Sequence, residues 1–360
     1  MAQKVAIVAG ASGVVGTRLS QELARSGEWR VIGCGRRLPA AEFRIAGVDY
    51  VAIDLADSAM CRKLASSVEG VTHLFYAARA DFVTGQHEAA DTNTVMFRNI
   101  LDAIEAAGQP LQHVHMVHGT KYYGSTEGRF PTPAREDDPR CMLSTFYYEQ
   151  EDVVFARNGS RRWSWSSSRP HAVCDSTLAT PRSMPLLIAT YAAISRHLGQ
   201  PLSFPGTPGN YRAVYQCTDA RLLARAIVWM ATDPRCADQA FNVTNGDFFR
   251  WENLWPVFAR EFGMELGPVR TIGMAALMPA KAAVWRDIVA RHRLAETPYE
   301  RMALWSYGDY LFTPDWDMMF STTKLRQFGF HDVVDTEQMF LEFFDGFRRG
   351  GIIPPVPVTE

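Results

Sequence analysis

The chain of 360 residues can bury one large core or a core with a smaller lobe, and 47% hydrophobic and 21% charged residues are typical of a folded globular protein. A formal net charge of −2 gives no basis for a nucleic-acid or membrane surface, so the arginine-rich segment 157–162 is interpreted as a solvated loop. Six cysteines without paired spacing predict reduced thiols in a cytoplasmic protein, and no apolar stretch is long enough to cross a bilayer.

Short apolar runs alternate with helical patterns through the first third of the chain. Strands are predicted at 4–10, 29–35, 48–55, 71–78 and 113–119, with helices ending near Arg25, centred near Arg62 and spanning 91–107. The strands are almost continuously apolar, as expected for strands that are covered on both faces. This order predicts an α/β fold of Rossmann type, with a doubly wound parallel sheet.

The alternation of strands and helices is less regular after residue 119. A polar segment rich in proline and glycine, 124–141, predicts a surface loop before a helix that begins near Ser144. Further elements are predicted as strands at 162–170 and 240–246 and as helices at 186–197, 251–263 and 336–347. We therefore assign residues 1–175 to a dinucleotide-binding domain, to which later strands such as 240–246 return, and residues 176–360 mainly to a smaller, interleaved substrate-binding lobe.

The segment VAIVAGASGVVGTRL places three glycines between the first strand and the first helix. Glycine is required where the chain turns sharply and its N–H groups approach a pyrophosphate at a helix N-terminus. The GxxGxxG spacing is the variant of the short-chain dehydrogenases. The candidate cofactor contacts in this turn are Gly10, Ser12, Gly13, Val14, Val15 and Gly16.

The next strand ends indicate which nicotinamide cofactor is bound. Arg36 and Arg37 follow the second strand, where an acid would accept from a ribose hydroxyl, and guanidinium groups suit a 2′-phosphate. NADPH is therefore favoured over NADH, with two solvated arginines as the alternative. Candidate cofactor contacts at the ends of the third and fourth strands are Asp54 and Leu55, near the adenine, and the small residues Ala77 and Ala78.

The segment STFYYEQEDVVF contains the candidate catalytic tyrosine. In the usual Tyr-x-x-x-Lys pattern a lysine one turn later lowers the pKa of the phenol, but none of the five lysines follows a tyrosine by four. Lys121 follows the fifth strand at the sheet edge where ligands bind, and the helix that carries Tyr147 is expected to begin beside the same edge. The alternative is an exposed loop lysine and a Tyr147–Tyr148 pair that only packs the helix.

Six motifs together resemble the progesterone 5β-reductase and iridoid synthase family, an atypical branch of the extended short-chain dehydrogenases/reductases. They are AGASGVVG, CGRR, GTKYYG, FYYEQEDVVF, RPHAVC and FNVTNGDFFRWENLW, and they cover nearly the whole chain in order. The resemblance implies that Tyr147 and Lys121 are catalytic, that Tyr148 packs, and that Tyr147, Pro170, His171 and Val173 contact the cofactor.

The resemblance implies NADPH-dependent 1,4-reduction of an enone or enal, a small-molecule α,β-unsaturated carbonyl compound. Hydride would reach the β-carbon while Tyr147 and Lys121 stabilise the enolate oxygen. Two alternatives stay open: a 1,2-acting carbonyl reductase or alcohol dehydrogenase that uses the same residues, and a non-catalytic sensor of NADPH. Formation of a homodimer is left open as well.

Further residues concern the substrate and a metal. Arg79 stands where plant members of the family have an aromatic residue, so it is a candidate for binding a polar or carboxylate-bearing enone, with a surface salt bridge as the alternative. The aromatic segment 304–312 is expected either to wall a substrate cavity or to form ordinary core. The resemblance places this segment over the substrate and so implies Trp305 as the candidate contact. The histidines of HVHMVH (113–118) lack a completing acid or cysteine, so no metal site is predicted.

Overall fold

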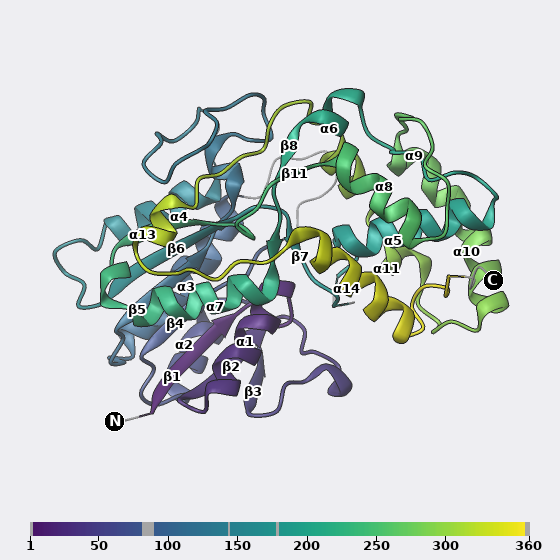
Figure 1. Ribbon diagram of the computed structural model, residues 1–360. Helices are drawn as coiled ribbons and strands as arrows, with labels where there is room; N and C mark the ends of the chain where they lie inside the picture. Colours follow the sequence, from purple (N-terminus) through teal and green to yellow (C-terminus); the bar gives the residue numbers. More distant parts are fainter. Residues whose placement is uncertain (1–2, 81–89, 143–144, 178–179, 357–360) are drawn as a thin grey trace.

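The computed structural model describes residues 3–80, 90–142, 145–177 and 180–356 (Figure 1). Its centre is a seven-stranded sheet in the order β10-β6-β5-β4-β1-β2-β3, in which every neighbouring pair is parallel. The strands of this sheet are β1 Lys4–Ala9, β2 Trp29–Gly35, β3 Val48–Ala52, β4 His73–Tyr76, β5 His113–Val117, β6 Ser164–Pro170 and β10 Gln239–Val243. The predicted doubly wound α/β fold is confirmed.

Two short strand pairs lie outside the main sheet. Strand β7 (Val173–Cys174) pairs with β9 (Thr218–Asp219) in parallel, and β8 (Val214–Tyr215) pairs with β11 (Phe249–Arg250) antiparallel. The helices are α1 Val14–Ser26, α2 Ser58–Ser67, α3 Ala90–Ala106, α4 Phe146–Phe155, α5 Met184–His197, α6 Pro208–Arg212, α7 Ala220–Thr232, α8 Trp251–Glu261, α9 Met274–Leu277, α10 Ala282–His292, α11 Tyr299–Met302, α12 Trp305–Phe312, α13 Thr323–Gln327 and α14 Thr336–Arg349. Four 3-10 helices complete the description: η1 Ala41–Phe43, η2 Thr120–Tyr123, η3 Pro234–Cys236 and η4 Met278–Lys281.

Helices cover both faces of the sheet because alternate strand residues point to opposite sides. In β1, Ile7 belongs to a buried cluster with side chains of α2, α3 and α4, whereas Val8 belongs to a cluster with side chains of α1 and α7. Helix α7, which the sequence analysis did not predict, packs against α1 and completes this second layer. A run of apolar residues along the strand therefore serves two cores.

A third core holds the remaining helices together. It is built largely from aromatic side chains of the carboxy-terminal half, among them Trp251, Trp255, Phe258 and Phe340. Figure 1 shows α5 and α8 to α11 grouped to one side of the sheet. Strand β10 and helix α7 also come from this half of the chain, yet they lie in and on the sheet, so the lobe and the sheet domain are interleaved.

The order of the strands determines where a ligand can enter. Strand β1 lies between β2 and β4, so the chain runs outward through β2 and β3 and then crosses back to β4. In open parallel sheets, the carboxyl ends of strands at such a switch point border a crevice that binds ligands. The residues that follow β1, β2, β4 and β5 therefore meet at one edge.

The histidines of β5 pair with serines of β6 across the sheet. His113 contacts the hydroxyls of Ser164 and Ser166 at 2.8 and 2.7 Å, and His115 contacts Ser166 and Ser168 at 2.8 and 3.0 Å. The parallel register that sets His113 opposite Ser164 also sets His115 opposite Ser166. These imidazoles have hydroxyl partners, and the described residues contain no group of three His, Cys, Asp or Glu suited to a metal ion.

The buried histidines make stability depend on pH. Burial lowers the pKa of His73 to about 4 and that of His115 and His171 to about 3. The unfolded chain takes up these protons below about pH 6.5, whereas the folded state does not, so stability is complete above that pH and falls between 6.5 and 3. We expect the free energy of unfolding, measured by urea denaturation, to fall by about 1.4 kcal/mol per pH unit for each histidine. A constant value between pH 7 and 5 would contradict this.

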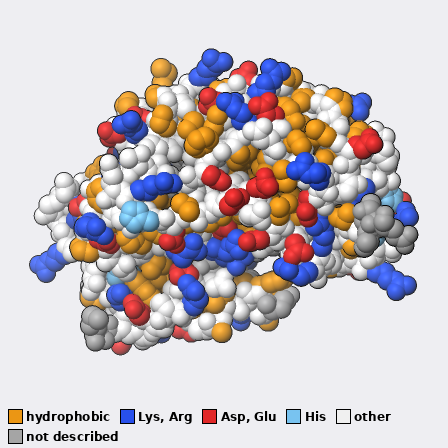
Figure 2. Space-filling model, viewed as in Figure 1, with side chains coloured by type: hydrophobic (Ala, Val, Ile, Leu, Met, Phe, Trp, Pro, Cys, Tyr) orange, Lys and Arg blue, Asp and Glu red, His pale blue; other side chains and the backbone are white. Residues whose placement is uncertain are grey.

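The surface is of mixed charge. Figure 2 shows lysine and arginine side chains interspersed with aspartate and glutamate over the face that it presents. Among the described residues, no helix combines the length and apolar character needed to cross a lipid bilayer.

Candidate functional site

The glycine turn after β1 is closed by contacts that exclude any side chain. Gly10 has φ +85°, and a Cβ on it would lie 2.7 Å from the carbonyl oxygen of Ala77. A Cβ on Gly16 would overlap the carbonyl group of Gly10. Gly10 therefore joins the ends of β1 and β4, and Gly16 lets α1 pack against the turn.

The start of α1 has the features of an anion site. Gly13 is exposed and forms the N-cap, and no side chain caps the helix there. The N–H groups of the first turn need acceptors, and the helix dipole favours negative charge at this end. Ser12, Val14 and Val15 are half-buried around the same turn. The glycine contacts and the uncapped helix fit the pyrophosphate of a dinucleotide.

Two glycine substitutions distinguish a role in folding from a role in ligand binding. We expect Gly16→Ala to lower the melting temperature of the ligand-free protein, because the new Cβ meets backbone that cannot move aside. Such crowding costs about 1–3 kcal/mol or more. We expect Gly13→Ala to keep the melting temperature, since its Cβ would lie 3.4 Å from the nearest carbonyl oxygen, but to weaken dinucleotide binding. Equal melting temperatures for the two variants would contradict this.

The ends of β2 and β3 present the candidate adenosine contacts. Arg36 and Arg37 are exposed directly after β2, and Asp54 is exposed after β3. Leu55 is buried, and its carbonyl oxygen accepts from the Asn99 side-chain amide at 2.9 Å. The two guanidinium groups are thus accessible at the edge of the sheet that carries the glycine turn.

The end of β4 lies against the same turn. Ala77 donates its N–H to the carbonyl oxygen of Ala9 at 2.9 Å, and the Ala78 nitrogen would be 2.7 Å from a Cβ on Gly10. Arg79 follows and is half-buried. The helix predicted to start near Ser144 begins at Phe146, and Ser144 itself lies outside the described residues.

Tyr147 lies in the first turn of α4, with its hydroxyl over the loop after β5. Thr145 caps the helix by accepting from the Tyr147 N–H at 3.1 Å. A Cβ on Gly119 would be 3.0 Å from the Tyr147 hydroxyl and 3.6 Å from the carbonyl oxygen of Pro170. Gly119 thus makes room for the phenol, and Tyr147 as a whole is only 5% exposed.

Lys121 stands two residues beyond Gly119, in η2. It is half-buried, and its Nζ lies 5.3 Å from the ring centroid of Tyr310 in α12. A cation at this distance from an aromatic face is attracted by the ring. Lys121 lies on the same loop as Gly119, which is beneath the Tyr147 hydroxyl. The Lys121 side chain packs on Tyr310 of the lobe.

Glu151 occupies the helical position where the usual pattern has a lysine. It is buried and accepts from Arg169 Nη2 at 3.1 Å, Arg140 Nη2 at 3.2 Å and the Tyr122 hydroxyl at 3.1 Å. The Arg169 guanidinium also stacks on the Tyr122 ring at 3.4 Å. The carboxylate one turn after Tyr147 is therefore neutralised by two arginines.

His118 lies between this ion network and Tyr147. Its ring stacks on the Tyr147 ring at a centroid distance of 4.9 Å, and its Nδ1 is 3.9 Å from Glu151 Oε1. Burial and the neighbouring Arg169 charge lower the pKa of His118 well below its usual value. A neutral imidazole thus supports one face of the phenol.

The segment after β6 continues the same edge. The His171 ring contacts the Thr120 hydroxyl through Nδ1 at 2.7 Å, and the His171 backbone N–H donates to Thr218 Oγ1 at 3.2 Å. Val173 lies in β7 and pairs with Thr218 of β9. Pro170 and His171 therefore adjoin the loop of Lys121.

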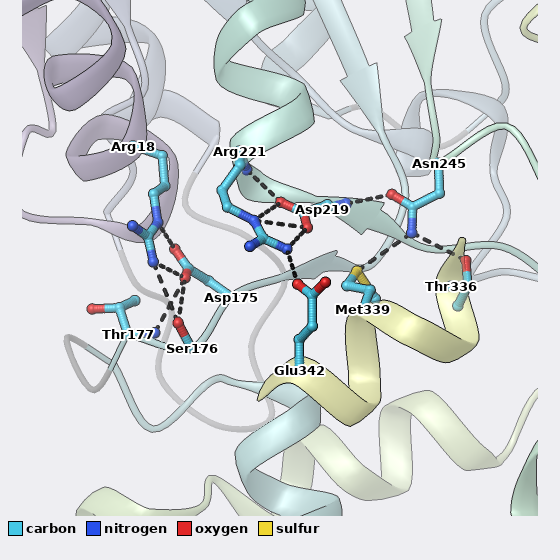
Figure 3. Close-up of polar contacts among 10 residues, drawn as sticks. All are labelled: Arg18, Asp175, Ser176, Thr177, Asp219, Arg221, Asn245, Thr336, Met339 and Glu342. Atoms are coloured by element: carbon cyan, nitrogen blue, oxygen red, sulfur yellow. Dashed lines mark hydrogen bonds and ion pairs between the residues drawn. The ribbon is translucent and has the colours of Figure 1, made fainter. Parts of the chain in front are cut away.

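Ion pairs fix the segments around this edge (Figure 3). Arg18 of α1 forms two hydrogen bonds with the buried carboxylate of Asp175, at 2.8 and 2.6 Å. Asp219 caps α7, pairs with Arg221 and donates its backbone N–H to Asn245 Oδ1. Arg221 also pairs with Glu342 of α14. Arg18 thus ties α1 to the segment after β7, and Arg221 ties α7 to α14 of the lobe.

The lobe side contains the aromatic segment 304–312 and one residue, Arg182, that the sequence analysis did not single out. Trp305 is 6% exposed and lies 5.9 Å from Tyr299 between ring centroids. The ring beside Lys121 is that of Tyr310, which stacks on Tyr307 at 5.9 Å, with Arg182 over both tyrosines. The spacing of three residues was a signal that both tyrosines share one helix face. Nothing local in the sequence linked Arg182 to them.

Comparison with known proteins identifies the family. Residues 44–354 match the PRISE-like Rossmann-fold domain. The chain belongs to the PRISE-like family. Its relatives include 3-oxo-Delta(4,5)-steroid 5-beta-reductase of Arabidopsis thaliana, 31% identical over 98% of this chain and 94% of that protein. They also include (S)-8-oxocitronellyl enol synthase of Antirrhinum majus, 32% identical over 98% of this chain and 93% of that protein. The resemblance predicted from the six motifs is confirmed.

Solved structures share the fold of this PRISE-like chain. A short-chain dehydrogenase/reductase superfamily protein of Agrobacterium tumefaciens with bound NAD has a TM-score of 0.66 at 16% identity, covering 96% of this chain and 97% of that one. UDP-glucose 4-epimerase of Thermus thermophilus in complex with NAD has a TM-score of 0.65 at 17% identity, covering 96% and 99%. The solved structures show that the chain has the fold of the short-chain dehydrogenases/reductases, and the reductase among its relatives identifies the protein as an oxidoreductase.

Proposed function

We propose that the protein uses NADPH to reduce the carbon–carbon double bond of an α,β-unsaturated carbonyl compound, with hydride added to the β-carbon. The observation that carries the proposal is the Tyr147 hydroxyl over Gly119, two residues before Lys121, at the carboxyl edge of the sheet. The names of the relatives support a reductase acting on such compounds: one is a reductase of a 3-oxo-Delta(4,5)-steroid.

The residues at the sheet edge fit the cofactor. The uncapped start of α1 would hold the pyrophosphate on the N–H groups of Val14 and Val15. Arg36 and Arg37 would pair with the 2′-phosphate that distinguishes NADPH from NADH. Asp54 and Leu55 would border the adenine. When bound, the nicotinamide supplies the hydride.

The chain supplies the stabilisation of charge. As the double bond is reduced, negative charge develops on the carbonyl oxygen of the substrate as an enolate. The Tyr147 hydroxyl donates a hydrogen bond to that oxygen, and the Lys121 ammonium adds positive charge beside it. The enolate then takes a proton at its α-carbon from water. The His118 ring stacks on the phenol ring, and the absence of a side chain at Gly119 leaves room for the hydroxyl.

One assay tests the proposal. The protein is mixed with NADPH or NADH and a panel of cyclic enones, enals and saturated ketones, and products are identified by mass spectrometry and NMR. We expect saturated carbonyl products with NADPH and little consumption of NADH. Allylic alcohols would identify a 1,2-acting carbonyl reductase. Tight NADPH binding without turnover of any acceptor would favour a sensor.

A further inference from the structure

We propose that Arg182 forms a subsite for a carboxylate, so that the substrate is an α,β-unsaturated carbonyl compound that carries an anionic group. This inference rests on the proposed function. Arg182 precedes α5 and is half-buried. Its guanidinium carbon lies 4.7 Å from the ring centroid of Tyr307 and 5.9 Å from that of Tyr310.

Arg182 shares an aromatic neighbour with Lys121, the candidate catalytic cation. The Lys121 Nζ also lies over the Tyr310 ring, 5.3 Å from its centroid. One aromatic side chain therefore contacts both the candidate catalytic ammonium and Arg182. A ligand that bridges the two cations would place its carbonyl oxygen at Lys121 and a second negative group at Arg182.

Among the described residues, the Arg182 guanidinium interacts with the rings of Tyr307 and Tyr310. It forms no ion pair with any carboxylate in the part of the chain that the structure describes. Other arginines of this protein bind an acid directly, as Arg18 binds Asp175 and Arg169 binds Glu151. A guanidinium stacked on rings keeps its planar edge for a carboxylate, which it binds with two parallel hydrogen bonds.

The backbone around Arg182 is held in place. The carbonyl oxygen of Pro181 accepts from the N–H of Leu304, at 2.9 Å, immediately before α12. The Ser183 hydroxyl lies 3.5 Å from the carbonyl oxygen of Asp175, whose carboxylate is bound by Arg18. The backbone around Arg182 is therefore held by the start of α12 and, through Asp175, by α1. A cation whose position is fixed binds an anion with less loss of entropy.

The test compares a cyclic enone bearing a carboxylate side chain with its methyl ester, at saturating NADPH. We expect the wild-type protein to have at least a tenfold higher kcat/KM for the acid. Arg182→Met is expected to lower kcat/KM for the acid about tenfold to a hundredfold and to leave the ester within about twofold. Arg182→Lys should recover part of the preference, and Arg286→Met, an exposed arginine of α10, should change neither substrate.

Three results would overturn the subsite. They are equal use of acid and ester by the wild-type protein, equal loss of both in Arg182→Met, and a raised KM for NADPH in that variant, which would assign Arg182 to the cofactor. If the ester is reduced without preference for the acid, the subsite fails and the proposed reaction stands. If neither is reduced, binding of the saturated acid to the NADP⁺-loaded protein decides: weaker binding to Arg182→Met supports the subsite, and equal binding overturns it.

Discussion

Replacing Tyr147 with phenylalanine is expected to lower kcat about a hundredfold while leaving NADPH affinity and stability nearly unchanged. The substitution removes the hydroxyl that lies over Gly119 and keeps the ring that stacks on His118. Steady-state kinetics with an accepted enone, NADPH titration by fluorescence and thermal unfolding measure the three quantities.

The matched control is the neighbouring tyrosine. The Tyr148 hydroxyl accepts from the Cys141 N–H at 2.8 Å and donates to the carbonyl oxygen of Tyr122, so it holds loops to the helix. Tyr148→Phe is expected to lower the melting temperature and to retain turnover at temperatures where the protein is folded. If Tyr147→Phe keeps full turnover, Tyr147 has no part in the reaction.

Replacing Glu151 with alanine is expected to cost about 3–5 kcal/mol in the free energy of unfolding. The change leaves the guanidinium of Arg169, itself 3% exposed, without its carboxylate, and it removes the acceptor of the Tyr122 hydroxyl. A buried charge without a partner is far more destabilising than the loss of an exposed pair. Urea denaturation at pH 7.5 measures the difference.

Asp152→Ala provides the comparison at the next residue. Its side chain is 60% exposed and pairs with Arg140, so its removal should cost no more than about 1 kcal/mol. The double variant Glu151→Leu with Arg169→Met should recover most of the loss, because neither charge then remains buried. A cost for Glu151→Ala no larger than that for Asp152→Ala would show that the network does not stabilise the fold.

The candidate site was predictable to different degrees. The glycine turn was visible because its three glycines recur at a fixed short spacing, and Gly16 is required by its contact with Gly10, whereas the contact of Gly10 with Ala77 appears only in the tertiary structure. Lys121 was a candidate because the ends of parallel strands meet at one edge. The catalytic roles of Lys121 and Tyr147 came from the resemblance, and they stay predictions that kinetic measurements on variants can test. A substrate contact at Trp305 also stays a prediction, and the ring beside Lys121 belongs to Tyr310, which stacks on Tyr307.

The sequence by itself determined the succession of strands and helices along the first half of the chain, the dinucleotide turn and the absence of a lysine one turn after Tyr147. Each of these depends on spacing within a short segment, where periodicity and steric limits act directly. Only the tertiary structure decided that Glu151 is neutralised by Arg169 and that Arg182 lies over the tyrosines of α12. Those partners are distant in the chain, and contacts formed by packing separate elements leave no local pattern in the sequence.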